Sequence, residues 1–568
     1  ERPDNGVGHY RAAHAAPLAL LAVYNRRMDL PALIAALKDP AAYPRPARVE
    51  IRQTHLSVAI LVGDTVYKIR KPVNLGFVDF TTLEKRKHDC DEEVRLNRRL
   101  APAVYRGVVP ITVEDRRVRV GGPGEPIEWA VEMVRLPDEA TLKAKIAREE
   151  VTVSQVVDLA RRLADFHRTA ARGNHISDFG RFEVVAGNAR ENFTQTAKHV
   201  GHIVPESRYD RVRELTEGAL AELNSLIEAR ASRGVPCDTH GDLHLSHVYL
   251  FPDRPSSDDL VIIDCIEFNE RFRFADPIAD LAFVVMDLQF HGRRDLAAAC
   301  ADTYFAASGD AEGCKLLPFY VAYRAVVRAK VEGMQVPPTN PRFYSKTELD
   351  ADQGKKLRGA LSDEQIEHLL SAQGHWRLAL STLEVPLRRP ALVLVGGLPG
   401  TGKSTLARGL AEAANFNLIR SDEVRKELAG VPLMEKAKGI YTHYWTQQTY
   451  SECFVRALSI WEADGRVLVD ATFHTLVNRG PLLQQAQSER VPNVFFVCRA
   501  DPVLVRERLR ARRGDASDAD ERVYDEMAAE WQSSVPTWME RQTFEIDTTD
   551  AGRALEQALS VLRGMGLA

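Results

Sequence analysis

Short apolar runs separated by polar turns dominate the chain between residues 55 and 136. Leu56–Val62 and Thr65–Ile69 flank the polar pair Gly63-Asp64, a pattern that predicts a β-hairpin. Apolar positions at helical spacing in Asp89–Leu100 predict a helix after this hairpin, and Trp129–Val134 predicts a further strand. The first part of the chain is therefore expected to be a small sheet with a helix.

From about residue 151 the period changes to that of helices, because Val156, Leu159, Leu163 and Phe166 recur three or four positions apart. Further helical segments are predicted in 215–227 and 275–335. Two short apolar runs, 248–251 and 260–263, interrupt this region around a Pro/Asp/Ser-rich turn and predict a small hairpin.

A third pattern begins after the Pro/Arg-rich segment 385–390, which we interpret as a linker. The apolar run Ala391–Val395 predicts a buried strand and Thr405–Ala414 a helix. Between them lies a match to G-x-x-x-x-G-K-[ST], the Walker A loop that cradles nucleotide phosphates. The nucleotide-binding candidates are Gly397, Gly400, Thr401, Gly402, Lys403, Ser404 and Thr405.

These residue types suit that role. The glycines let backbone N–H groups approach the phosphates, and the helix N-terminus adds positive potential. Lys403 is expected to reach the β- and γ-phosphates and to act in catalysis, and Ser404 to ligate Mg²⁺. ATP and Mg²⁺ are therefore the predicted cofactors.

Composition limits the remaining possibilities. The 568 residues carry a formal net charge of −4, with 27% charged and 45% hydrophobic residues, which is typical of an ordinary globular protein. Seven scattered cysteines without a C-x-x-C pair favour reduced thiols and a cytoplasmic location. Since no apolar run has the length of a membrane span, no membrane partner is expected. Residues 1–27 are interpreted as a poorly ordered extension, with a signal peptide as the alternative.

A second set of chemical residues lies in the first half. The loop 240–247 contains Asp242, and Asp264 ends an apolar run about twenty residues later. One carboxylate can orient an acceptor hydroxyl and take its proton, and the other can hold Mg²⁺. Upstream, Lys68 on a predicted strand and Glu93 on the following helix could brace a phosphate, with Glu92 as the alternative partner.

These motifs make residues 50–300 resemble the aminoglycoside phosphotransferase family, whose fold is similar to that of protein kinases. The resemblance implies a two-lobed α+β domain in which Asp242 is the catalytic residue and Asp264 a metal ligand. It also implies that Lys68 binds phosphate, that Glu93 supports it, and that the segment around Met133 is the hinge that meets adenine.

One position departs from that family. His247 stands where the family carries Asn as a ligand of a second metal ion. Imidazole is a poor ligand for Mg²⁺, which prefers hard oxygen donors. His247 could instead contact phosphate, the site could use one metal ion, or this half could bind nucleotide without catalysis. His240 is expected to brace the loop through a backbone hydrogen bond.

The chain after the Walker A loop indicates a kinase rather than a motor. Asp422 follows a predicted strand and can orient an acceptor hydroxyl, and Arg425 one turn later can hold an anionic group. Ser421 or Asp422 could instead cap the helix. Asp470 ends another buried strand, where an acidic residue supports Mg²⁺, and Arg479 is a candidate for contacting a phosphate.

A basic helix, 506–513, follows, and arginines on a flap beside a phosphate site can stabilise the transferring group. Arg508 and Arg512 are the catalytic candidates in it. Residues 390–550 resemble small P-loop kinases of the adenylate-kinase and gluconate-kinase type and the kinase module of polynucleotide 5′-kinases. That resemblance implies an α/β domain with a parallel sheet.

The sequence thus predicts a kinase-like N-lobe (28–137), a helical C-lobe (138–385) and a P-loop kinase domain (390–568). The leading hypothesis is an ATP-dependent bifunctional phosphotransferase that acts on hydroxyl groups of small metabolites. Two alternatives stay open. The P-loop half could phosphorylate 5′-hydroxyl ends of nucleic acid, or the first half could be a nucleotide sensor that regulates the second.

Overall fold

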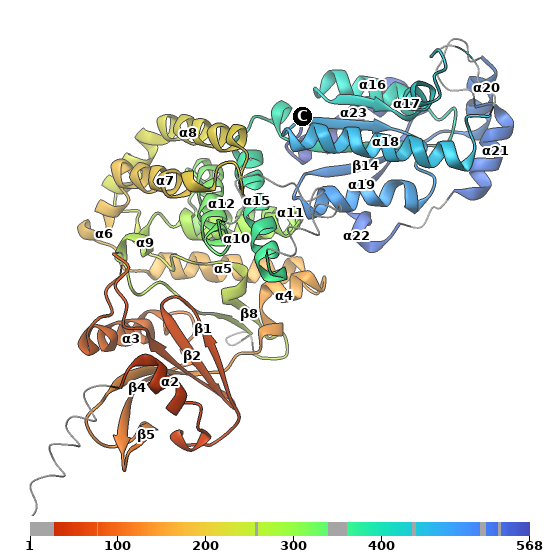
Figure 1. Cartoon of the computed structure of the whole chain (residues 1–568). Coiled ribbons are helices and arrows are strands. Elements are labelled where there is room, and N and C mark those ends of the chain that lie inside the picture. The colour runs from red at the N-terminus through yellow and green to blue at the C-terminus, as the bar shows by residue number, and fades with distance from the viewer. Residues whose placement is uncertain are drawn as a thin grey trace, which may run out of the picture. The chain divides into compact units, whose positions relative to one another are not determined.

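The computed structural model describes residues 28–76, 78–255, 259–338, 361–433, 435, 439–511, 519–531 and 535–568. The predicted extension 1–27 and Arg512 lie outside these ranges. The chain forms two compact units. The first comprises residues 1–180, 230–284 and 299–309, and the second comprises 181–229, 285–298 and 310–568. We describe each unit by itself (Figure 1).

The first unit contains a six-stranded antiparallel sheet with the strand order β1-β2-β3-β6-β4-β5. The predicted hairpin is present, since Val62 at the end of β2 pairs with Thr65 at the start of β3. The sheet strands are β1 (Val49–Gln53), β2 (Ser57–Val62), β3 (Thr65–Arg70), β4 (Tyr105–Glu114), β5 (Arg117–Val120) and β6 (Glu128–Val134).

Both faces of this sheet are covered. Leu33 and Leu37 pack with Ile60 and Ile69 in one core cluster. Cys90 and Val94 of α3 pack in a second cluster with Val131 and Met133, among other residues. The short α2 (Leu30–Ala36) therefore covers one face, and α3 (Leu83–Asn97) covers the other. The helix α3 begins six residues earlier than the sequence pattern predicts, because Thr82 caps it at Lys85 N–H.

The rest of the first unit is mainly helical, with short strand pairs that carry the site loops. The predicted hairpin at 248–263 is present as an antiparallel pair. The four apolar positions predicted in α5 are all buried. The elements are α4 (Leu142–Ala147), α5 (Val153–Thr169), α6 (Asn174–Phe179), β7 (Cys237–Asp238), β8 (Val248–Leu250), β9 (Leu260–Ile262), α9 (Glu270–Arg273) and β10 (Phe274–Ala275).

Three helices contain residues of both units: α8 (Glu206–Ser232), α10 (Ile278–Phe290) and α11 (Arg294–Ser308). The second unit adds α7 (Phe182–Thr196), α12 (Leu317–Gly333) and α15 (Asp363–Leu383) before its sheet begins. The linker interpretation of 385–390 corresponds to a 3₁₀ turn, Pro386–Arg388.

The second unit contains a five-stranded parallel sheet with the order β12-β13-β11-β14-β15. Its strands are β11 (Ala391–Gly397), β12 (Asn417–Arg420), β13 (Arg466–Asp470), β14 (Asn493–Arg499) and β15 (Thr543–Asp547). Its helices are α16 (Lys403–Ala413), α17 (Ser421–Leu428), α18 (His443–Glu462), α19 (Leu476–Ser488), α20 (Pro502–Ala511), α21 (Glu521–Glu530), α22 (Thr537–Glu540) and α23 (Ala551–Gly564).

Two separate cores cover this sheet, as expected for an α/β layer architecture. One contains Trp461 of α18 and Leu483 of α19, and the other contains Leu410 of α16 and Leu562 of α23. The chain order of the strands changes direction at β11, the central strand. Ligands of open parallel sheets bind at the carboxyl ends of the strands near such a point, which is where the Walker A loop leaves β11.

Candidate functional sites

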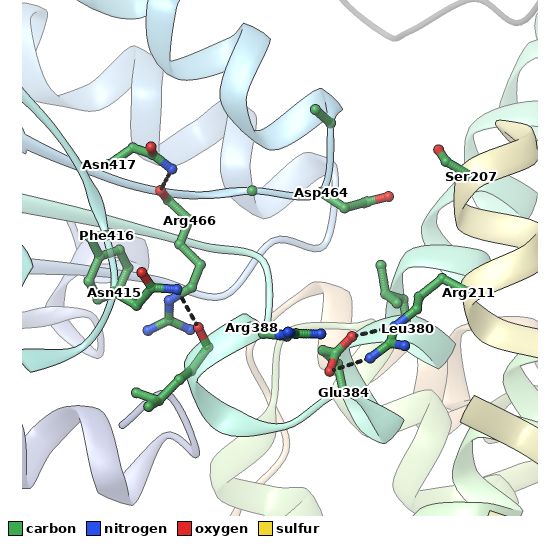
Figure 2. Close-up of a pocket in the computed structure, with 13 residues that line it drawn as sticks. Ser207, Arg211, Leu380, Glu384, Arg388, Asn415, Phe416, Asn417, Asp464 and Arg466 are labelled. Carbon is green, nitrogen blue, oxygen red and sulfur yellow. Dashed lines mark hydrogen bonds and ion pairs between the residues drawn. The ribbon is translucent and has the colours of Figure 1, made fainter. Parts of the chain in front are cut away.

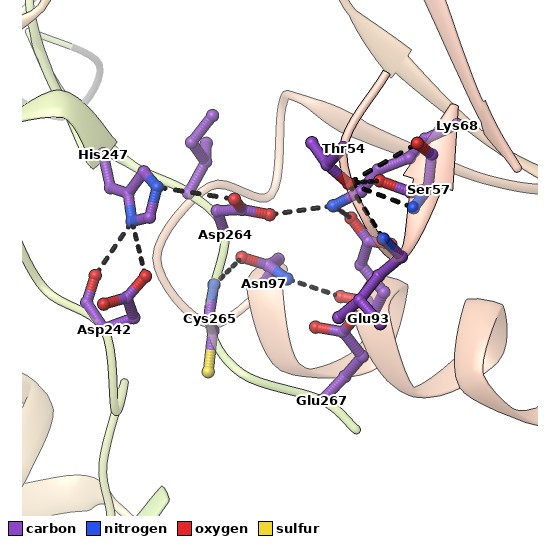
Figure 3. A network of polar contacts seen from close by, with 12 residues as sticks. Thr54, Ser57, Lys68, Glu93, Asn97, Asp242, His247, Asp264, Cys265 and Glu267 are labelled. Atoms are coloured by element: carbon purple, nitrogen blue, oxygen red, sulfur yellow. Dashed lines mark hydrogen bonds and ion pairs between the residues drawn. The ribbon is translucent and has the colours of Figure 1, made fainter. Parts of the chain in front are cut away.

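Lys68 is the centre of a charged network in the first unit (Figure 3). Its Nζ donates to Glu93 Oε1 at 2.9 Å and to Asp264 Oδ1 at 2.8 Å. The rival carboxylate, Glu92, pairs with Arg95 instead. The structure thus brings together three of the predicted residues, from β3, α3 and the loop after β9.

The charges in this network shift one another's proton affinities. Burial alone would lower the pKa of Lys68, but Asp264 and Glu93 together raise it well above its ordinary value. Lys68 holds the pKa of Asp264 below its ordinary range. Asp264 also has a left-handed backbone, with φ +64. Such a conformation in a non-glycine residue costs about 1–2 kcal/mol and is typical of functional sites.

Beneath Lys68 lies a buried acidic cluster that the sequence analysis missed. The guanidinium of Arg70 contacts Asp89, Glu93 and Glu267. Burial and then the charge of Glu93 raise the pKa of Glu267 to about 8, although Arg70 opposes them. Glu267 follows Asp264 by three positions, and only the tertiary fold reveals that both face the Lys68 network.

A cavity of about 480 Å³ opens beside Lys68. Lys68, Asp242 and Asp264 line it, and so do Met133 and Ser57, the first residue of β2. A mostly apolar cleft with a few convergent polar groups is the usual form of a small-molecule site. Met133 therefore lies in the same cavity as the charged residues, as the predicted hinge position requires.

The loop that carries Asp242 is held by backbone contacts. Asp280 accepts from the N–H groups of His240 and Gly241, at 2.6 and 2.9 Å. Gly241 has φ +88, and a Cβ on it would lie 2.8 Å from the Phe272 carbonyl oxygen, so glycine is required there. His240 Nε2 contacts the Ile263 carbonyl at 2.9 Å, which agrees with the predicted bracing contact.

His247 joins the two carboxylates of this site (Figure 3). Its Nδ1 contacts the Asp242 carbonyl oxygen at 2.8 Å, and its Nε2 lies 3.4 Å from Asp264 Oδ2. The oxygen of Asp264 fits a hard cation such as Mg²⁺, whereas the nitrogen of His247 does not. The donor set is therefore only half suited to Mg²⁺.

In the second unit the Walker A loop has the backbone that its function needs. Gly397, Gly400 and Gly402 have φ values of +148, +81 and +89. A Cβ on Gly397 would lie 2.7 Å from Thr401 Oγ1 and 2.9 Å from the Cys498 carbonyl oxygen. Only glycine adopts this path, so backbone N–H groups can line the loop.

Asp470 lies beside this loop at the end of β13. Its carboxylate is 4% exposed, and Oδ1 has no hydrogen-bond partner among the described residues. Burial raises its pKa, while Lys403, Ser404 and Arg420 lower it. Because a buried carboxylate oxygen without a partner next to a serine hydroxyl suits a hydrated Mg²⁺, Ser404 and Asp470 fit the predicted metal.

Asp422 and Arg425 occupy the first two turns of α17. The side chain of neither Ser421 nor Asp422 caps this helix, whose N-cap is Arg420 without a side-chain hydrogen bond, so the capping alternative is wrong. Asp422 is partly exposed and close enough to raise the pKa of Asp470. Arg425 donates to the Ile440 carbonyl oxygen at 3.1 Å, and its buried Nε has no partner among the described residues.

The remaining predicted arginines differ in placement. Arg479 is 1% exposed and donates to the Phe473 carbonyl oxygen at 2.8 Å, so it lies in the interior. Arg508 donates from Nη2 to the carbonyl oxygens of Thr548 and Thr549, at 2.9 and 3.0 Å. Its buried Nη1 has no partner in the described part of the chain and lies 3.6 Å from where a Cβ on Gly402 would be. Arg508 therefore lies against the Walker A loop.

A second cavity in this unit, of about 430 Å³, is not the phosphate site (Figure 2). Its lining includes Asn417 and Arg466, the first residues of β12 and β13, together with Arg211 and Glu384. It is therefore at the amino ends of the strands, opposite the Walker A loop. Arg466 donates to the carbonyl oxygens of Pro386, Arg389, Ala414 and Leu567, which joins four segments of the unit.

Comparison with known proteins identifies the two halves. Residues 77–317 match the model described as phosphotransferase enzyme family, which corresponds to the aminoglycoside phosphotransferase type. Residues 392–533 match a model described as AAA domain. The protein thus contains a kinase-like phosphotransferase domain followed by a P-loop kinase domain, and both are kinase-type domains.

The chain is 32% identical over 486 residues to uncharacterized protein Rv2004c of Mycobacterium tuberculosis (strain ATCC 25618 / H37Rv). The alignment covers 85% of this chain and 90% of that protein, and the chain belongs to the same family.

Two solved structures are also similar to parts of the chain. A gluconokinase from Sinorhizobium meliloti 1021 is 20% identical, with a TM-score of 0.24, and covers 32% of this chain and 95% of its own. The GDP complex of aminoglycoside 2′-phosphotransferase-IIIa is 16% identical, with a TM-score of 0.33, and covers 58% and 92%. TM-scores this low add no argument to the family matches. Among the described residues, every helix is too short or too polar to cross a membrane.

Proposed function

We propose that the protein is an ATP-dependent bifunctional phosphotransferase that transfers γ-phosphate to hydroxyl groups of small molecules, with one site in each half. The observation that carries this proposal is the meeting of Lys68 and Asp264 in a cavity that Asp242 also lines, with the buried Glu93 holding Lys68 from behind. Lys68, Asp242 and Asp264 come from three separate segments, and a purely structural role would not require them to line one cavity.

In the first half, Asp242 would accept the proton of the acceptor hydroxyl as the phosphoryl group is transferred. Lys68 would hold nucleotide phosphates, and Glu93 would keep its ammonium in place. A divalent ion at Asp264 would neutralise charge on the phosphates. Asp242 is at the mouth of this network, and its side chain is about one-third exposed, which leaves room for an acceptor.

In the second half, Lys403 and the loop N–H groups would hold the phosphates, and Ser404 with Asp470 would hold hydrated Mg²⁺. Asp422 would orient the acceptor hydroxyl, with Arg425 nearby for an anionic substituent. Arg508 would contact the nucleotide through Nη1, which has no partner among the residues that the structure describes. A phosphate contact by Arg479 would require its side chain to leave the Phe473 carbonyl.

We also propose the domain limits 28–137, 138–385 and 390–568 for the N-lobe, the C-lobe and the P-loop domain. The test uses γ-labelled ATP with a panel of hydroxylated metabolites and oligonucleotides with 5′-hydroxyl ends. Asp242→Asn should abolish one set of products and Lys403→Ala a different set. If both variants retain every product of the wild type, the proposal fails.

A further inference from the structure

Four consecutive backbone N–H groups in the segment that carries Asp264 are all hydrogen-bonded. The first and the last, those of Ile263 and Ile266, donate to carbonyl oxygens of the loop 240–247 at 3.0 and 3.1 Å. The two inner N–H groups, those of Asp264 and Cys265, donate to side chains instead. Both of these side chains come from one distant part of the chain, the end of α3 and the start of β4.

Asn97, the last residue of α3, accepts the N–H of Cys265 (Figure 3). Its Oδ1 lies 2.9 Å from that nitrogen, and its Nδ2 donates to the Glu93 carbonyl oxygen at 2.9 Å. The second bond orients the amide, because the nitrogen can only donate and the oxygen can only accept. Asn97 is 1% exposed, so it acts on the site through the backbone and does not itself meet a ligand.

Tyr105, the first residue of β4, accepts the N–H of Asp264 at 3.3 Å. Its side chain is buried in a core cluster with Val94 and Met133, so packing determines where the hydroxyl lies. The N–H that it holds belongs to the residue with φ +64. A left-handed backbone at a non-glycine residue persists only where the surrounding structure holds it, and the two side-chain acceptors supply that hold.

The chain between these two acceptors is tied to the Asp242 side of the site as well. Arg99 Nη1 donates to the Asp238 carbonyl oxygen at 2.9 Å, and Nη2 donates to the Thr239 carbonyl oxygen at 3.1 Å. Residues 99–104 also line a cavity of about 1350 Å³, separate from the one beside Lys68. Because the segment faces this space on one side, its position there depends on its polar contacts.

We propose that Asn97 and Tyr105 are positioning residues that hold Asp264 in its left-handed conformation, so that its carboxylate lines the nucleotide cavity before any ligand binds. The inference rests on the proposed function, which gives Asp264 its role at the phosphates. It is tested first on the backbone of nucleotide-free protein, so its failure and that of the proposed function are distinguishable.

The experiment compares amide hydrogen exchange in full-length wild type, Tyr105→Phe and Asn97→Leu by mass spectrometry with fragmentation that resolves single amides. Tyr105→Phe removes one acceptor and keeps the ring, so the Asp264 N–H should exchange about tenfold faster than in the wild type. Asn97→Leu should have the same effect on the Cys265 N–H. Amides of β2 and β3 should keep their wild-type rates in both variants.

Tyr43→Phe is the matched control, because it also removes a buried hydroxyl, one that donates to the Leu37 carbonyl oxygen at 2.5 Å. It should leave the exchange of Asp264 and Cys265 unchanged. The positioning role is overturned if Tyr105→Phe and Asn97→Leu leave these two amides at wild-type rates. It is equally overturned if they accelerate exchange across β2 and β3 to the same extent.

A second readout connects the backbone to the ligand. In a Lys403→Ala background, Asn97→Leu should weaken nucleotide binding about tenfold in the presence of Mg²⁺, since a displaced Asp264 holds the ion less well. In EDTA its nucleotide affinity should match that of the background protein. An equal loss with and without Mg²⁺ would show that Asn97 does not act through Asp264. Absence of nucleotide binding by the first half of the wild type would count against the proposed function, while the exchange test would still decide the positioning role.

Discussion

Lys68 Nζ lies 2.8 Å from Asp264 Oδ1, although 196 positions separate the two residues in the chain. The pair joins the sheet to the loop after β9 and neutralises two charges that a nucleotide with its metal ion would otherwise meet. Binding of that ligand would therefore exchange one set of charge contacts for another instead of filling an uncharged cavity.

The first prediction concerns this pair. Lys68→Met should weaken nucleotide binding by the first half about tenfold or more, because a charge-assisted phosphate contact is lost. The pKa of Asp264 should rise toward its ordinary value, since Lys68 is the main cause of its depression. Titration calorimetry in a Lys403→Ala background isolates this half. The exposed Lys38→Met is the matched control, and equal affinities in both variants would contradict the assignment.

Arg508 provides the second prediction. Arg508→Gln should reduce nucleotide affinity of the P-loop half about tenfold, because its buried Nη1 adjoins Gly402 and is available to a ligand. Arg506 lies on the same helix, but its guanidinium is paired with Asp525 at 3.0 Å. Arg506→Gln should therefore bind as the wild type does. Fluorescent-nucleotide titration in a Lys68→Met background measures the affinities of both variants. A larger loss of affinity in Arg506→Gln than in Arg508→Gln would refute the placement of Arg508 beside the nucleotide.

The third prediction concerns stability of the second unit. Burial lowers the pKa of Arg466 to about 10, and within the described part of the chain its guanidinium donates only to backbone carbonyl oxygens. Arg466→Met would leave several buried acceptors unsatisfied and should destabilise the unit by about 3 kcal/mol or more. Chemical denaturation monitors this change. Arg563→Met, which removes an exposed arginine paired with Glu556, should leave the free energy of unfolding close to that of the wild type.

The fourth prediction is a pH dependence. Burial, and then Lys198, lower the pKa of His199 from 6.5 to about 4, and the ring is 3% exposed. Between these values the unfolded chain binds a proton that the native state does not. The contribution of His199 to the free energy of unfolding should therefore be fully present above about pH 6.5 and should be lost as the pH drops from about 6.5 to 4.

His199→Met removes this titration. The wild type should lose roughly 2 kcal/mol more than the variant when pH falls from 7.5 to 5. Denaturant unfolding of both proteins at the two pH values gives the comparison. Parallel losses in the two proteins would show that His199 is not responsible.

Several elements followed directly from local sequence. The hairpin around Gly63, the Walker A loop and the buried strand that ends in Asp470 each combine a strong apolar pattern with a turn or a motif. Strands β4 and β15 were not predicted. Gly107 and Pro110 interrupt the apolar pattern of β4, and β15 is an edge strand with charged positions. Pairing decides their conformation: β4 pairs with β5 and β6, and β15 pairs with β14.

The residues of the candidate sites also divide into those that the sequence indicated and those that only the fold revealed. The sequence order of Lys68, Glu93, Asp242 and Asp264 indicated a shared site, and the structure supplied the contacts between Lys68 and its two acidic partners. Glu267 could not be found by spacing alone, because its role depends on burial beside Arg70. The alternative that Ser421 or Asp422 caps the helix was wrong, since Arg420 occupies the capping position without a side-chain bond.

The contacts of Arg466 have a practical meaning for experiments on separated halves. Its acceptors include Pro386 and Leu567, so one guanidinium donates to the segments at both ends of the P-loop module. A fragment expressed from residue 390 would lack the Pro386 and Arg389 acceptors, and one trimmed to the matched range 392–533 would also lack β15 and α23. An excised P-loop module should therefore begin before Pro386 and extend through Leu567.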